Sequence, residues 1–150
     1  MTAIQTAHPT SMPSANAEPR TLSVGVLRGL LLVEAALGLA LAVVLSMQAP
    51  TESALLGGDA GRGAEQTLRF AAGFSFLFAI TAAVASRGVR GLRSWSWTIA
   101  ALLQLVLAIG TGIATMTATW HPSYLLGFAA AAIVMLALSA PSVRQALGQE

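Results

Sequence analysis

One acidic side chain, Glu34, lies inside a long apolar stretch of this 150-residue chain. Ionisable residues inside membrane-spanning segments are rare, and they face other helices or a water-filled path. A carboxyl group in such a place can form a hydrogen bond to a neighbouring helix, or it can couple the movement of a proton or cation. Glu34 is therefore the residue from which a functional hypothesis has to start.

Two other polar residues are expected at a similar depth. Counted inward from the ends of their apolar stretches, Ser75 and Gln104 fall near the level of Glu34. Desolvation disfavours the charged form of a carboxyl group, so we expect a neutral Glu34 that donates a hydrogen bond to Gln104. Arg28 is the competing partner, but its long side chain is expected to extend to the membrane surface. The sequence predicts an intramembrane polar cluster of Glu34, Ser75 and Gln104.

Four apolar stretches have to position this cluster. They cover residues 24–47, 68–86, 95–118 and 124–140. Each is near the roughly 20 residues that a helix needs to cross about 30 Å of hydrocarbon. The chain is 55% hydrophobic and only 9% charged, whereas soluble domains have about 25% charged residues. These features predict an all-α membrane protein, a bundle of four transmembrane helices.

The segments outside the apolar stretches are expected to lack a core of their own. Residues 1–22 are rich in Thr, Ser and Pro and predict a flexible cytoplasmic tail before a transmembrane domain at 23–141. Residues 142–150 form a short cytoplasmic C-terminal tail in this prediction. Residues 48–67 contain Pro50 and several glycines, which favour turns, so a long loop is expected there.

The distribution of arginines predicts the orientation, because positive residues near short loops stay in the cytoplasm. Six of them fall on the side of the two termini: Arg20, Arg28, Arg87, Arg90, Arg93 and Arg144. The opposite side has two arginines and three acidic residues: Arg62, Arg69, Glu52, Asp59 and Glu65. Both termini are therefore expected in the cytoplasm, with the protein in the plasma membrane. The absence of Lys beside abundant Ala, Gly and Leu indicates a bacterial source with a GC-rich genome.

The basic segment between the second and third stretches allows two interpretations. Arg87, Arg90 and Arg93 could bind anionic lipid head groups, at about 1 kcal/mol for each side chain. A basic cytoplasmic hairpin is, however, what the topology alone requires. Anionic lipid contact at these three arginines is therefore one hypothesis, beside a purely topological role.

Small residues spaced four apart are expected where membrane helices pack closely. Three stretches carry such stripes. They consist of Glu34, Gly38, Ala42 and Ser46 in the first stretch, of Ala71, Ser75, Ala79 and Ala83 in the second, and of Gly110, Ala114 and Ala118 beside Ala108 and Gly112 in the third. Each stripe can receive a neighbouring helix. They predict ordinary bundle packing and do not indicate a particular ligand.

Several kinds of chemistry have no sequence support. The chain has no Cys, no glycine loop of the G-x-x-x-x-G-K type and no cluster of metal-ligating residues. We therefore expect no enzyme activity, no metal and no cofactor. The net charge of +2 comes without a basic patch interleaved with aromatic residues, so we expect no nucleic-acid partner.

The segment Leu68-Arg69-Phe70-Ala71-Ala72-Gly73-Phe74, with an acidic Gly-rich segment before it and a basic hairpin after it, resembles small uncharacterised four-helix membrane proteins of actinobacteria. The likeness spans about residues 24–141 and implies a fold and a cell-envelope location. The chain is also similar to small multidrug resistance transporters in size, helix count and an acid in the first helix, where Glu34 stands. It lacks their Lys after that helix and their pocket aromatics.

Two classes of function remain after these exclusions. The first is an accessory or interaction subunit, in contact with the lipid bilayer and with a partner membrane protein or other copies of itself. The alternative is a small proton-coupled transporter or an oligomeric pore that uses Glu34. A phage-type hole-forming protein is a third possibility, ranked last. A buried Glu34 paired with Gln104 would favour the first class, and a path to water lined by several polar side chains would favour transport.

Overall fold

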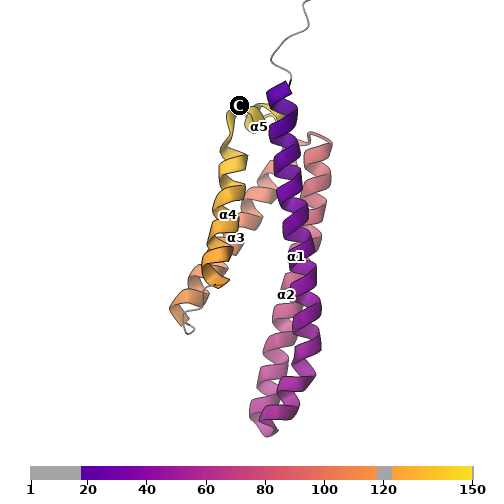
Figure 1. Cartoon of the computed structure of the whole chain (residues 1–150), viewed down its shortest axis with the longest axis vertical. Coiled ribbons are helices and arrows are strands. Elements are labelled where there is room, and N and C mark those ends of the chain that lie inside the picture. The colour runs from indigo at the N-terminus through magenta and orange to yellow at the C-terminus, as the bar shows by residue number, and fades with distance from the viewer. Residues whose placement is uncertain (1–17, 118–122, 150) are drawn as a thin grey trace, which may run out of the picture.

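The computed structural model describes residues 18–117 and 123–149, in which all regular elements are helices. The helices are α1 (Glu18–Leu56), α2 (Gly58–Arg90), α3 (Ser94–Thr117), α4 (Ser123–Ser139) and α5 (Pro141–Ala146) (Figure 1). The prediction of an all-α chain is confirmed for this part of the molecule. Residues 1–17 of the expected flexible tail lie outside the described residues, and the rest of that segment belongs to α1.

The first two helices form a hairpin that is longer than the predicted spans. They contain 39 and 33 residues, which correspond to about 58 Å and 50 Å at 1.5 Å per residue. They lie side by side along their length and are joined at Gly57 and Gly58, both at positive φ (62° and 54°) (Figure 1). The prediction of a loop over residues 48–67 is wrong, because both helices continue through this segment, which we call the distal hairpin.

Close packing explains why the distal hairpin is helical despite its glycines. Gly61 is buried, and a Cβ atom at this position would overlap the backbone carbonyl oxygen of Ser53 on α1. Ala49 is fully buried, and α1 continues through Pro50, although proline lacks the N–H for one helix hydrogen bond and its ring crowds the carbonyl group four residues earlier. Two ion pairs at helical spacing, three and four residues apart, stabilise the start of α2: Asp59–Arg62 and Glu65–Arg69.

The second hairpin consists of α3 and α4. It meets the first hairpin at the α5 end of the molecule and diverges from it toward the other end (Figure 1). The predicted spans 95–118 and 124–140 agree with α3 and α4 to within one residue at each end; residue 118 lies outside the described residues. The turn between α2 and α3 contains Leu92 at φ 50°.

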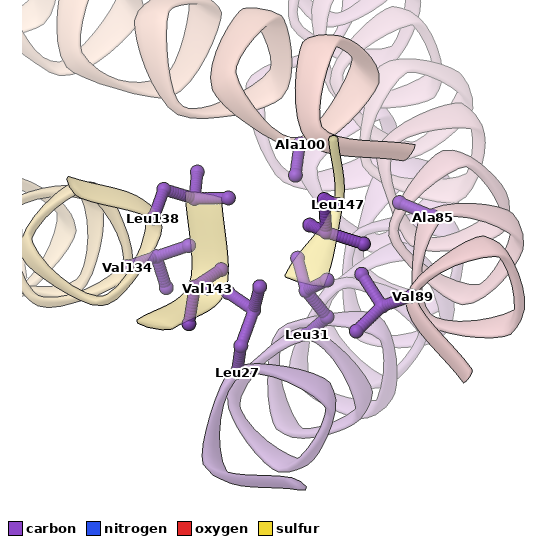
Figure 2. Packing of buried hydrophobic residues seen from close by; sticks show 9 residues of the cluster. All are labelled: Leu27, Leu31, Ala85, Val89, Ala100, Val134, Leu138, Val143 and Leu147. Atoms are coloured by element: carbon purple, nitrogen blue, oxygen red, sulfur yellow. The ribbon is translucent and has the colours of Figure 1, made fainter. Parts of the chain in front are cut away.

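A hydrophobic cluster joins the two hairpins at the α5 end (Figure 2). Its buried members come from all five helices: Leu27, Leu31, Ala85, Val89, Ala100, Val134, Leu138, Val143 and Leu147. Val143 and Leu147, each 1% exposed, are contributed by α5 and the residue that follows it. The expected C-terminal tail therefore contains a short helix that packs on the bundle. Nearby, the indole N–H of Trp97 donates to the carbonyl oxygen of Leu138 at 3.1 Å.

Among the residues that the structure describes, three segments are long and apolar enough to cross a membrane: Ser23–Leu56, Gly58–Arg90 and Ser94–Ile113. The apolar part of α4, Leu126–Ser139, is shorter. Large apolar side chains cover the outer faces of these helices; Phe70, for example, is 79% exposed. Such a surface suits a chain that is surrounded by lipid, because soluble monomers rarely expose extensive apolar patches.

Candidate intramembrane polar site

A hydrogen bond between Glu34 and Gln104 connects α1 to α3. The side-chain amide Nε2 of Gln104 donates to Glu34 Oε2 at 2.7 Å. Gln104 is fully buried and Glu34 is 8% exposed. The backbones of α1 and α3 have little direct contact, so two long polar side chains bridge the space between these helices.

The pair lies next to the hydrophobic cluster. Leu31 precedes Glu34 by three residues and Ala100 precedes Gln104 by four, so each cluster residue is one turn away on the same helix face. The apolar side chains therefore cover the pair on the α5 side. In such surroundings an interhelical hydrogen bond fixes which helix faces meet, with an energy of about 0.6 to 2 kcal/mol.

One side-chain oxygen on each of Glu34 and Gln104 takes no part in this hydrogen bond. Glu34 Oε1 and Gln104 Oε1 are both buried and have no hydrogen-bond partner among the described residues. Both atoms are acceptors when the carboxyl group is ionised, whereas a carboxylic acid has one O–H to donate. A single proton on Glu34 would let it donate to Gln104 Oε1 while it accepts from Gln104 Nε2. The expected neutral, hydrogen-bonded Glu34 suits this arrangement.

Ser75 lies close to the pair but is not hydrogen-bonded to it. Its hydroxyl donates to the carbonyl oxygen of Ala71, one turn earlier in α2, at 2.9 Å. This intrahelical bond is the usual way in which a serine inside a helix is satisfied. The structure thus brings together Glu34 and Gln104 of the predicted cluster, and it places Ser75 on the wall of a cavity that Glu34 also lines.

The small-residue stripes of α1 and α2 pack against each other. A Cβ atom at Gly38 would lie 3.3 Å from both the Ala79 Cβ and the Ser75 carbonyl oxygen, so the two backbones approach closely here. The stripe on α3 behaves differently, because nothing lies within 4 Å of a Cβ atom at Gly110. The expectation that Gly110 receives a neighbouring helix is therefore wrong.

Gly110 opens instead on a cavity of about 510 Å³ between the two hairpins. Side chains from α1, α2, α3 and α4 line it, and most of them are apolar, including Leu37, Phe74 and Phe78. Its polar side chains are Glu34, Ser75 and Thr111. The sequence did not predict this cavity, because it depends on the divergence of the hairpins.

The basic residues gather at the end of the molecule that α5 covers. Arg87 and Arg90 lie in the last turn of α2, Arg93 lies in the following turn, and all three are exposed. Arg144 lies in α5 at the same end (Figure 1). The structure places the three predicted lipid-contacting arginines together on one surface, and their contact with anionic lipid stays a prediction.

The packing of α5 on the bundle was not predicted from the sequence. The signal was present, because Pro141 suits the first turn of a helix and Val143 and Leu147 are four residues apart on one face.

No known protein family, curated protein or solved structure matches this chain.

Proposed function

We propose that the chain is a multi-pass protein of the bacterial plasma membrane, with four spans and both termini in the cytoplasm. With 17 residues, α4 is about 26 Å long, which is close to the roughly 30 Å of hydrocarbon in a bilayer. The α5 end carries Arg87, Arg90, Arg93 and Arg144, whereas the distal hairpin has a mixture of charges. This asymmetry supports an orientation with both termini in the cytoplasm, because arginine prefers the cytoplasmic side of a membrane. On that side the arginine side chains can contact anionic head groups.

Within that membrane, we propose an accessory or interaction role without catalysis. The observation that carries this proposal is the Glu34–Gln104 hydrogen bond, which uses the intramembrane carboxyl group to connect α1 and α3. The hydroxyl groups of Ser75 and Thr111 likewise donate hydrogen bonds to carbonyl oxygens of their own helices. The interior polar groups therefore serve the fold, and the broad apolar outer surface is left for lipid, a partner membrane protein or a second copy.

A small proton-coupled transporter or an oligomeric pore is the second candidate. The cavity favours it, because Glu34 lines a space between the helices. Against it stands the apolar character of that wall, since an ion path has to offer several polar groups to replace water. The two candidates differ in whether Glu34 carries protons across the membrane.

A proton-flux measurement separates them. The full chain and its Glu34→Gln variant are reconstituted into vesicles that contain a pH-sensitive dye, and a pH gradient is applied with and without a membrane potential. For an accessory protein we expect the same slow flux in both samples and in protein-free vesicles. A flux that requires Glu34 would contradict the accessory role and establish transport.

A further inference from the structure

The short helix α5 connects the two hairpins at the end where they meet. It packs against α1 of the first hairpin and against α4 of the second. Val143 lies between Leu27 of α1 and Val134 of α4 (Figure 2). Leu147, the residue that follows α5, lies beside Leu31 of α1 (Figure 2). The C-terminal segment therefore fills the space between α1 and α4 in the hydrophobic cluster.

The hairpins are also connected at the turn between α2 and α3. Gly88 near the end of α2 is buried, and a Cβ atom at this position would overlap the side chain of Ser96 at the start of α3. Further from this end, the Glu34–Gln104 hydrogen bond bridges α1 and α3, and the hairpins then diverge (Figure 1). The turn thus provides a pivot, and the α5 segment holds the other two helices, α1 and α4, together.

The attachment of α5 is weak compared with that of the long helices. Its six residues are far fewer than the roughly 12 to 15 that an isolated helix needs in water, so its helical form depends on docking. Ala140, at φ −60° and ψ 129°, interrupts the chain between α4 and α5 and serves as a hinge. Beyond α5, the amide of Gln149 donates to the carbonyl oxygen of Ser94 at 3.3 Å on the exposed surface. Segments with few buried contacts open locally while the rest of the protein stays folded.

We propose that α5 together with Leu147 is a strap that sets the angle between the two hairpins. When the strap is docked, it holds α1 and α4 together. When it is released, the hairpins pivot about the turn between α2 and α3. Binding of the released strap by another molecule would therefore change the arrangement of the helices inside the membrane. The proposal goes beyond the accessory role, and the proposed orientation decides only that the strap lies on the cytoplasmic side.

Distances between spin labels test the proposal in the full chain, which has no native Cys. Nitroxides at Phe70→Cys on α2 and Met116→Cys on α3 report the separation of the hairpins, and the native side chains are 79% and 88% exposed. Leu147→Asp releases the strap, because burying an unpaired charge is strongly unfavourable. In phosphatidylcholine vesicles we expect one narrow distance distribution with the native strap and a broad distribution in Leu147→Asp.

Two controls accompany this measurement. Gln145→Asp adds the same charge to the exposed side of the same helix, and it should leave the Phe70–Met116 distribution narrow. A second label pair, Val33→Cys with Phe70→Cys, lies within the first hairpin on exposed positions. This pair should give the same distribution with and without Leu147→Asp, because the first hairpin moves as a unit.

Hydrogen exchange of the unaltered protein tests the strap if Leu147→Asp does not fold. The amides of Arg144 and Leu147 donate to the carbonyl oxygens of Ala140 and Val143. We expect these two amides to exchange faster than amides in the middle of α1 and α4, because the strap opens by itself.

A narrow Phe70–Met116 distribution in a folded Leu147→Asp protein would overturn the proposal, because the hairpins would then keep their angle without the strap. Equal broadening in Gln145→Asp, or a change within the first hairpin, would overturn it as well. So would exchange of the α5 amides at the rate of those in α1 and α4, since α5 would then open only when the bundle unfolds.

Discussion

At the scale of single residues, Glu34 combines two properties that rarely occur together. It lies in the apolar interior, and the one hydrogen-bond partner of its carboxyl group in the described part of the chain is an uncharged side chain, that of Gln104. An ion pair would hold a charge inside the membrane, whereas a carboxyl and an amide group can satisfy each other as neutral groups. The sequence predicts this contact, because both residues fall at one depth of their apolar stretches, and the structure adds its direction, since Gln104 donates and Glu34 accepts.

A double-mutant cycle measures this contact. We expect Glu34→Leu and Gln104→Leu each to lower the free energy of unfolding by about 1 to 3 kcal/mol, because each leaves a buried polar group without a partner. The double variant should lose less than the sum, with a coupling of about 0.6 to 2 kcal/mol. The measurement is unfolding in mixed micelles followed by circular dichroism.

Ser75→Ala provides the control for this cycle, because the Ser75 hydroxyl bonds only within α2. Its effect should add to that of Gln104→Leu without coupling. Strict additivity of Glu34→Leu and Gln104→Leu would show that the two side chains do not support each other.

At the scale of helices, hydropathy located α3 and α4 well, and it failed between α1 and α2. Glycine and proline in residues 48–67 favour turns, yet within this segment only Gly57 and Gly58 adopt positive φ. Gly61 serves instead for the close approach of two helices, which depends on a residue of the partner helix, Ser53. A single-sequence pattern does not distinguish these uses. The ion pairs at helical spacing, such as Glu65–Arg69 at 2.6 Å, were the available signal for helix.

Two glycines of α2 test the packing of the distal hairpin. Replacing Gly by Ala inside a helix is favourable by roughly 0.5 to 1 kcal/mol when the site has room. Gly63 has nothing within 4 Å of its Cβ position, so Gly63→Ala should stabilise the protein. Gly61→Ala should destabilise it by about 1 to 3 kcal/mol, as overpacking does, because its Cβ would overlap the Ser53 carbonyl oxygen.

Thermal unfolding and hydrogen exchange of the distal amides report the two effects. A stabilising Gly61→Ala would mean that α1 and α2 are further apart in solution, in agreement with a loop over residues 48–67.

At the scale of the whole molecule, two helical hairpins are joined at one end by a hydrophobic cluster and separate toward the other (Figure 1). The joined end carries the exposed arginines and is covered by α5. The basic residues and the hydrophobic cluster therefore lie at the same end of the molecule. The all-helical character and the positions of α3 and α4 could be predicted from the sequence, whereas the full lengths of α1 and α2 could not. The cluster, the cavity and the docking of α5 could not, because they depend on which hairpin faces meet.

Single cysteines test the orientation of this assembly, since the chain has no native Cys. Ala60 in the distal hairpin and Ser94 at the start of α3 are both exposed and lie at opposite ends. With the basic end in the cytoplasm, a membrane-impermeant maleimide should label Ala60→Cys in intact bacterial cells. It should label Ser94→Cys only after permeabilisation, and the reverse pattern would invert the topology.

The most direct test of the structural role of Glu34 is its infrared carboxyl absorption in bilayers, assigned by its loss in Glu34→Gln. Because the Glu34 carboxyl is buried against Gln104, we predict a signal that does not respond to bulk pH around neutrality and that exchanges slowly in D₂O. The same signal should shift in Gln104→Leu, which removes the hydrogen bond. A signal that titrates near neutral pH, or exchanges as soon as D₂O is added, would show that water reaches Glu34 and would contradict its assignment as a sealed contact between α1 and α3.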